Sequence, residues 1–191
     1  MVWTMLIDFA ATFFSGSLSL IPIFADQILK VGPRGFGWLR AAPAIGALLG
    51  SLYTSLRVLP QRQGTIFVTA VAFYGAGYAM FGLSRNFVLS FAALVVVGLA
   101  DVISTVVRQV LRQRVTPDAL RGRMVAVNMI FFMGGPQLGE LEAGVVASLF
   151  ASVAVGCTFA VVSGGAATLL LAAITLLYGR AVREYRAPPG G

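Results

Sequence analysis

Long apolar runs separated by short polar turns make up most of this chain. An α-helix that crosses a lipid bilayer needs about 20 mostly apolar residues. By this measure the pattern predicts six crossing helices, over residues 3–29, 36–56, 65–83, 87–111, 124–150 and 155–179. We therefore expect an all-α membrane protein, with residues 1–179 as a six-helix transmembrane bundle and residues 180–191 as a cytoplasmic tail.

The composition excludes most soluble classes of protein. Hydrophobic residues make up 58% of the 191 positions and charged residues only 11%, whereas soluble domains carry roughly 25% charged residues. The sequence has no histidine and one cysteine, Cys157 in an apolar run. It therefore lacks Ser-His and Cys-His catalysis and a disulfide within the chain. We expect no enzyme activity, no metal and no cofactor.

The net charge of +7 has a topological explanation. In a soluble domain it would suggest nucleic-acid binding, but here the basic residues gather at the ends of apolar runs. If the six helices alternate in direction, one side holds 10 of the 14 basic residues. These are Arg57, Arg62, Arg108, Arg112, Arg114, Arg121, Arg123, Arg180, Arg183 and Arg186, against Lys30, Arg34, Arg40 and Arg85. Because cytoplasmic loops carry the excess of basic residues, we expect both termini to be cytoplasmic.

Two carboxylates within the fifth apolar run are candidates for proton coupling. Glu140 and Glu142 are two positions apart, so on a helix they point about 200° apart and cannot form one paired site. Ionisable groups inside a membrane are costly and mark functional sites by default. One reading is a carboxyl that takes up and releases a proton during transport, and the other is a structural hydrogen bond to a neighbouring helix.

Asp101 and Arg108 lie two helical turns apart near the end of the fourth apolar run. Asp101 is a further proton-coupling or cavity candidate. Either residue could belong to a gate that forms in one conformation only, to a permanent ion pair that anchors the loop, or to a substrate contact. Arg121 and Arg123, in the arginine-rich stretch that follows, are also gating or ion-pair candidates.

The other charged candidates lie near the ends of the first two helices. Asp26 and Arg40 are both expected near the external face, where a pair between them could be structural or an outer gate, and Arg40 is also a cavity candidate. Asp8 is expected near the cytoplasmic end of the first helix, either at a seam with another domain or in the lipid headgroup region.

Several of these residues also carry a family resemblance. Asp101, Arg108, Thr116-Pro117-Asp118, Arg121-Gly122-Arg123 and the run from Gly139 to Gly144 resemble the C-terminal half of a major facilitator superfamily transporter, nearest to the bacterial drug and siderophore efflux branch. The segments from Asp8 and from Leu39 fit the same pattern. The loop 57–64 matches the family's gating loop only in part. Arg62 and Gly64 are present, but the expected acidic residue is missing.

The resemblance implies a fold and a function. Superfamily transporters have twelve helices in two halves, and each half is an inverted repeat of three plus three helices. The chain is then expected in the bacterial inner membrane as one half of a proton-coupled exporter of drug-like or siderophore-like molecules, working by alternating access. Its partners would be lipid, the small-molecule substrate and a second six-helix half, either a missing N-terminal half or another chain. The alternative is a non-transporting scaffold or regulatory subunit derived from a transporter half.

Overall fold

A computed structural model of the chain describes residues 9–11, 13–14, 18–56, 63–115 and 121–178. Within these residues every regular element is a helix, as the sequence predicts. The elements are the 3₁₀ turn η1 (Leu18–Leu20), α2 (Ile21–Ile23), the π-helical turn η2 (Phe24–Ile28), α3 (Gly32–Leu56), α4 (Gln63–Leu83), α5 (Phe87–Val115), α6 (Arg121–Ser148) and α7 (Val153–Tyr178).

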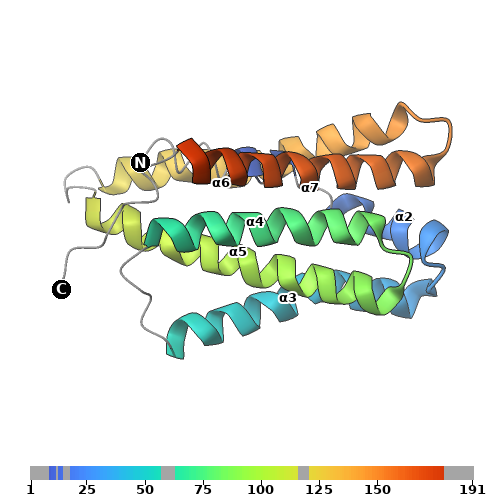
Figure 1. Ribbon diagram of the computed structural model, residues 1–191, viewed down its shortest axis with the longest axis horizontal. Coiled ribbons are helices and arrows are strands. Elements are labelled where there is room, and N and C mark those ends of the chain that lie inside the picture. The colour runs from blue at the N-terminus through green and yellow to red at the C-terminus, as the bar shows by residue number, and fades with distance from the viewer. Residues whose placement is uncertain (1–8, 12, 15–17, 57–62, 116–120, 179–191) are drawn as a thin grey trace.

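The long helices form one elongated antiparallel bundle (Figure 1). Helix α3 packs on α5, α5 on α4, α4 on α7, and α7 on α6. The described residues between 9 and 28, called the N-terminal segment below, contact α3, α6 and α7. This segment therefore lies between the two ends of the helix row.

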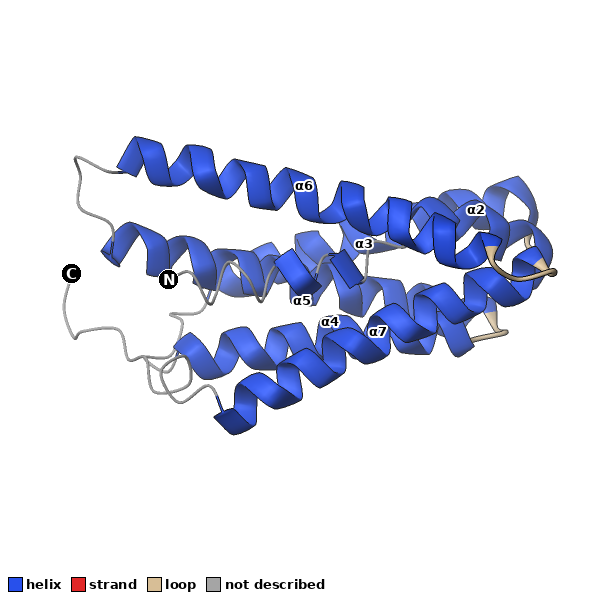
Figure 2. Ribbon diagram, turned by 90° about the horizontal axis from the view of Figure 1, so that it is seen from above, coloured by secondary structure: helices blue, strands red, loops and turns tan. Residues whose placement is uncertain are grey.

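Alternation of direction brings particular helix ends together (Figure 2). The last residues of α3, α5 and α7 lie at the same end of the bundle as the first residues of α4 and α6. This end contains the stretch from Arg108 to Val115 and the start of α6 at Arg121, so we call it the arginine-rich end. Arg85 lies at the opposite end, in the turn between α4 and α5.

Three of the described helical stretches are long and apolar enough to cross a membrane, namely residues 64–83, 87–110 and 153–177. Helix α6 is long enough but more polar, because it carries Glu140 and Glu142 in addition to the arginines of its first turn. The expected count of six crossings remains a prediction.

The N-terminal segment is not the single continuous α-helix expected over residues 3–29. Pro22 has no amide hydrogen with which to bond the carbonyl of Leu18, and the backbone there passes from a 3₁₀ turn to a π-helical turn. The amide of Leu29 donates to the carbonyl of Phe24 at 2.8 Å. The helix then ends at Lys30, whose φ of 52° is left-handed.

Helix α3 begins at Gly32, four residues earlier than the sequence pattern indicates. Gly32 has a φ of 66°, a left-handed conformation that glycine adopts readily because it has no Cβ. Pro33 follows within the first turn, where its missing amide hydrogen costs nothing because the first amides of a helix have no intrahelical acceptor. Proline here starts a helix, although residues 30–35 lie between the first two helices that the sequence predicts.

Glycines mark the points where the helices approach most closely. A Cβ on Gly98 of α5 would overlap the backbone of Pro43 in α3, and one on Gly46 would overlap the backbone of Val95. Gly75 of α4 and Gly165 of α7 face each other in the same way. Membrane helices associate through close van der Waals packing, because the hydrophobic effect does not drive helices together within lipid. These contacts therefore set the distances between neighbouring helices.

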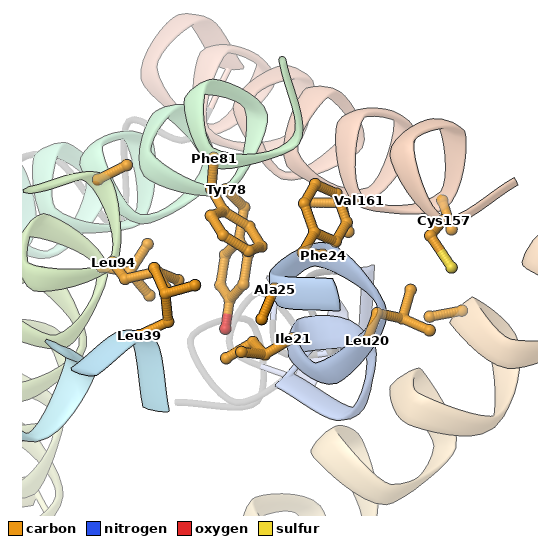
Figure 3. Packing of buried hydrophobic residues seen from close by; sticks show 14 of the residues in the cluster. Leu20, Ile21, Phe24, Ala25, Leu39, Tyr78, Phe81, Leu94, Cys157 and Val161 are labelled. Carbon is orange, nitrogen blue, oxygen red and sulfur yellow. The ribbon is translucent and has the colours of Figure 1, made fainter. Parts of the chain in front are cut away.

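Buried side chains of the N-terminal segment join the two sides of the bundle (Figure 3). The ring of Phe24 lies 4.6 Å from that of Phe81 in α4, and both side chains are fully buried. On the other side of the segment, Gly139 of α6 packs directly against the backbone of Phe13. The segment thereby fixes α6 relative to α4, two helices that are not neighbours in the helix row.

Candidate functional site

Asp101 is the central residue of α5 and is only partly exposed. Its carboxyl interacts electrostatically with the hydroxyls of Tyr74 and Tyr78 on the neighbouring helix α4. No ion pair to Asp101 forms within the described part of the chain. A carboxyl at mid-helix with polar but uncharged neighbours is chemically suited to gaining and losing a proton.

Tyr74 and Tyr78 are four residues apart and therefore share one face of α4. Their rings meet edge to face with centroids 5.2 Å apart. Tyr78 is 2% exposed. Figure 3 shows its hydroxyl among Ile21, Ala25 and Leu39, so it points into the bundle interior.

Glu140 of α6 also interacts electrostatically with Tyr78. Glu142 lies on another side of the same helix and is partly exposed. The helical rotation of about 200° between these two positions accounts for their different surroundings. We define the tyrosine–carboxylate cluster as Tyr74, Tyr78, Asp101 and Glu140.

Arg108 lies on α5 toward the arginine-rich end and is 6% exposed. Its Nε donates to the carbonyl of Ser104 at 3.3 Å, and one terminal nitrogen donates to Thr105 Oγ1 at 2.9 Å. These acceptors are on its own helix, and they hold the guanidinium along α5. Whether Arg108 belongs to a gate or to a permanent anchor remains a prediction.

The remaining sequence candidates are not part of the cluster. Asp26 and Arg40 are both exposed, and no ion pair joins them in the structure as described. Arg121 and Arg123 lie in the first turn of α6, but their side chains are outside the described part. Asp8 also lies outside the described residues.

Sequence reasoning missed both tyrosines of the cluster. The signal was available, because Tyr74 and Tyr78 are the only hydroxyl-bearing aromatic residues of α4 and stand four apart in an otherwise strongly apolar helix. Their relation to Asp101 and Glu140 could not be read in the same way, since it depends on how α4 packs against α5 and how α6 is placed.

The cluster and the helices around it define a class of protein. Long apolar helices that carry carboxyl and hydroxyl groups are typical of a multi-pass membrane protein. The family follows from comparison: the model of the transmembrane secretion effector family, a branch of the major facilitator superfamily, matches residues 4–188. The chain belongs to that family.

The chain is also similar to curated exporters. It is 24% identical over 178 residues to the enterobactin exporter of Shigella flexneri, covering 93% of this chain and 42% of the relative. It is 23% identical over 170 residues to the enterobactin exporter of Escherichia coli O1:K1, covering 89% of this chain and 39% of the relative. The chain thus spans about two-fifths of the length of these relatives.

Membership of a transporter superfamily confirms the resemblance seen in the sequence. It also agrees with the expectation of a transmembrane transport protein rather than an enzyme. The share of the relatives' length that is matched is close to that of one half of a two-half transporter.

Proposed function

We propose that this chain is one half of a secondary transporter of the bacterial inner membrane that exports a small molecule in exchange for protons. The tyrosine–carboxylate cluster is the observation that carries the proposal. Two carboxyls, from α5 and α6, interact electrostatically with tyrosine hydroxyls on α4. Ionisable groups within a membrane are costly, so their presence in spanning helices points to a function.

Asp101 and Glu140 are the proposed proton-coupling groups. They belong to different helices, and each interacts electrostatically with Tyr78. A proton taken up there would remove a negative charge from the interior, which is the kind of change that biases one conformation over another. Glu142 is a further candidate on a separate side of α6.

The proposed substrates are drug-like or siderophore-like small molecules. The support is the similarity to exporters named for enterobactin, a similarity that is distant and covers part of those proteins. A bundle interior that combines tyrosine rings and hydroxyls with carboxyls offers both apolar contact and hydrogen bonding to such molecules.

Alternating access by rocking of two halves requires a second six-helix half, supplied by a missing N-terminal half or another chain. The matched length supports this, since the relatives are more than twice as long as the part that aligns. We assign Arg108, Arg121 and Arg123 to a cytoplasmic gate or anchor, together with Asp8. Asp26 and Arg40 are assigned to the external face. The bundle would comprise residues 1–179, with both termini in the cytoplasm.

Everted membrane vesicles from cells that express the transporter containing this chain provide the test. Enterobactin or ethidium is added to vesicles with a respiratory proton gradient, and collapse of the gradient is followed with a pH-sensitive dye. Asp101→Asn and Glu140→Gln should each reduce substrate-driven proton movement at least about tenfold, because neither side chain can bind the transported proton. Glu142→Gln is measured in the same way, and a reduced substrate-driven proton movement would show that Glu142 also contributes.

The matched control is Gln109→Ala, which changes an exposed polar side chain on the same helix as Asp101. Its proton movement should equal that of the unmodified protein. Unchanged movement in both Asp101→Asn and Glu140→Gln would remove the cluster from the mechanism. A chain that assembles in the membrane but never supports substrate-dependent proton movement, with either probe and with its partner half present, would favour the scaffold alternative.

A further inference from the structure

Ser90, in the first turns of α5, has a completely buried side chain. Its hydroxyl makes no hydrogen bond within the described part of the chain. A buried donor without an acceptor is costly, because it has given up its bonds to water without replacing them. Such a group in a folded protein therefore calls for a physical explanation.

Other hydroxyls in the long helices bond to the carbonyl four residues earlier in the same helix. Thr69 of α4 donates to such a carbonyl at 3.0 Å, and Thr175 of α7 does so at 2.7 Å. The carbonyl in the same position relative to Ser90 is that of Asn86. We would therefore expect the Ser90 hydroxyl to donate to the Asn86 carbonyl.

The Asn86 carbonyl is already fully used. It accepts from the amide of Ser90 at 3.0 Å, which is the first backbone bond of α5, and from the hydroxyl of Ser84 at 2.9 Å. A carbonyl oxygen has two lone pairs. The Ser84 hydroxyl thus occupies the position that the Ser90 hydroxyl would need.

The Ser84 hydroxyl has a second acceptor within its own helix geometry. The carbonyl of Met80 lies four residues earlier and already accepts from the Ser84 amide at 3.0 Å. If the Ser84 hydroxyl turned to Met80, the Asn86 carbonyl would be released to Ser90. The Asn86 amide would then lose its 3.2 Å bond to Ser84 Oγ, but Asn86 is exposed and its amide can bond to water. Both arrangements contain two hydrogen bonds among these groups.

Arg85 connects the same turn to α7. One of its terminal nitrogens donates to the carbonyl of Ser84 at 3.3 Å, and the other donates to Thr158 Oγ1 of α7 at 3.4 Å. The turn therefore joins three helices, because it also ends α4 and begins α5. A change of bonding within it acts on all three.

We propose that the turn Ser84-Arg85-Asn86 is a two-state hydrogen-bond switch, in which the hydroxyls of Ser84 and Ser90 compete for the carbonyl of Asn86. In the structure Ser84 holds this carbonyl and Ser90 is left without a partner. In the second state Ser90 holds it, and Ser84 bonds to its own helix. The two states differ at the start of α5, the helix that carries Asp101. The switch requires neither proton coupling nor a substrate.

A double-mutant cycle on the full chain in lipid nanodiscs tests the competition. The midpoint of thermal unfolding is measured by circular dichroism for Ser90→Ala, Ser84→Ala and the double variant. Ser90→Ala alone removes a donor that lacks an acceptor, so it should raise the midpoint by about 2 to 4 °C. In the Ser84→Ala background the Ser90 hydroxyl has gained the Asn86 carbonyl, so the same substitution should lower the midpoint by about 2 °C or more.

Ser163→Ala is the matched control. Ser163 lies in α7, and its partly buried hydroxyl donates to the carbonyl of Ala160 at 3.1 Å. The substitution has the same effect on helix propensity as Ser90→Ala but removes a hydrogen bond that is made. Its effect on the midpoint should be the same in both backgrounds, and the shifts at Ser90 are measured relative to it.

Hydrogen exchange gives a readout that a change of stability elsewhere would not move. The Asn86 amide is bonded to Ser84 only in the state that the structure shows. Ser90→Ala abolishes the second state, so exchange of this amide should slow by about threefold or more. The same amide in Ser163→Ala should exchange as in the unmodified chain.

Three results would overturn the proposal. A midpoint for Ser90→Ala no higher than that for Ser163→Ala would show that the Ser90 hydroxyl already has an acceptor. A Ser90→Ala effect of the same sign in both backgrounds would show that Ser84 does not compete with it. Unchanged exchange of the Asn86 amide in Ser90→Ala would show that the second state is not populated.

Discussion

The backbone of Pro43 in α3 lies directly against Gly98 in α5, so that a Cβ at position 98 would overlap the Pro43 carbonyl. Pro43 is inside a continuous helix, and its ring removes one backbone hydrogen bond from that helix. Gly98 lies three residues before Asp101, on the helix that supplies a central carboxyl of the cluster. The crossing of α3 and α5 therefore determines where Asp101 is held.

Replacing Gly98 with alanine should lower the free energy of unfolding by about 1 to 3 kcal/mol, because the added methyl group must displace backbone rather than a flexible side chain. The free energy of unfolding can be measured by titration with a denaturing detergent and followed by circular dichroism.

Gly134→Ala is the matched control, because Gly134 also lies in a helix but has nothing within 4 Å of the added Cβ. Alanine is the better helix former, so this change should be neutral or stabilising by up to about 1 kcal/mol. Equal effects of the two substitutions would mean that the close approach of α3 and α5 is wrong.

Phe24→Ala should cost on the order of 2 kcal/mol of unfolding free energy. In a membrane little is gained by moving an apolar group from lipid to protein, so most of the cost comes from the cavity left opposite Phe81. Phe73→Ala is the comparison, since Phe73 is 62% exposed and its removal leaves no cavity. A loss at Phe24 no greater than at Phe73 would argue against the packing of the N-terminal segment on α4.

Asn86 caps the start of α5, where its Oδ1 accepts from the amides of Val88 at 2.8 Å and Leu89 at 3.4 Å. Asn86→Ala should lower stability by about 1 kcal/mol, the usual cost of losing an N-terminal cap. Asn86→Ser keeps an oxygen acceptor and should recover most of that loss. Thermal unfolding of the three proteins in the same detergent gives the comparison.

The charge bias predicts the orientation of the bundle in the membrane. Arg85 is exposed at one end, and Gly122 is exposed with open space around it at the arginine-rich end. In a Cys157→Ala background, Arg85→Cys should react with a membrane-impermeant maleimide on intact cells. Gly122→Cys should react only after the membrane is opened, and Cys157→Ala alone should not react. Labelling of Gly122→Cys on intact cells would show that the bundle has the opposite orientation in the membrane.

Some features of the fold could be read directly from the chain. The polar turn Ser84-Arg85-Asn86 separates two apolar runs, and in the structure α4 ends at Leu83 and α5 begins at Phe87. Local chemistry suffices here, because Asn86 bonds the amides that follow it. Local chemistry was ambiguous at Gly32-Pro33, since the same two residues can break a helix or begin one. The sequence pattern places the start of the second helix at residue 36, whereas α3 begins at Gly32.

The sequence pattern could not predict which types of helix the N-terminal segment contains. Residues 18–29 are apolar enough to continue one helix, yet the backbone changes from 3₁₀ to α to π within eleven residues, 18–28. The segment packs on α3, α6 and α7 together, and the side chains of Ile21, Phe24 and Ala25 are buried there. Tertiary contacts of this kind can select a helix type that no single-helix pattern encodes.

By itself the sequence determined that the protein is helical, that its apolar runs belong in a membrane, and which family it resembles, because hydropathy, helix length and local caps act within single segments. The tertiary structure alone decided that Tyr78 of α4 interacts electrostatically with Asp101 of α5 and Glu140 of α6. Those residues are up to 62 positions apart in the chain. Their meeting depends on glycine-mediated helix crossings such as Gly98 on Pro43, and packing geometry of that kind has no periodic signature in the sequence.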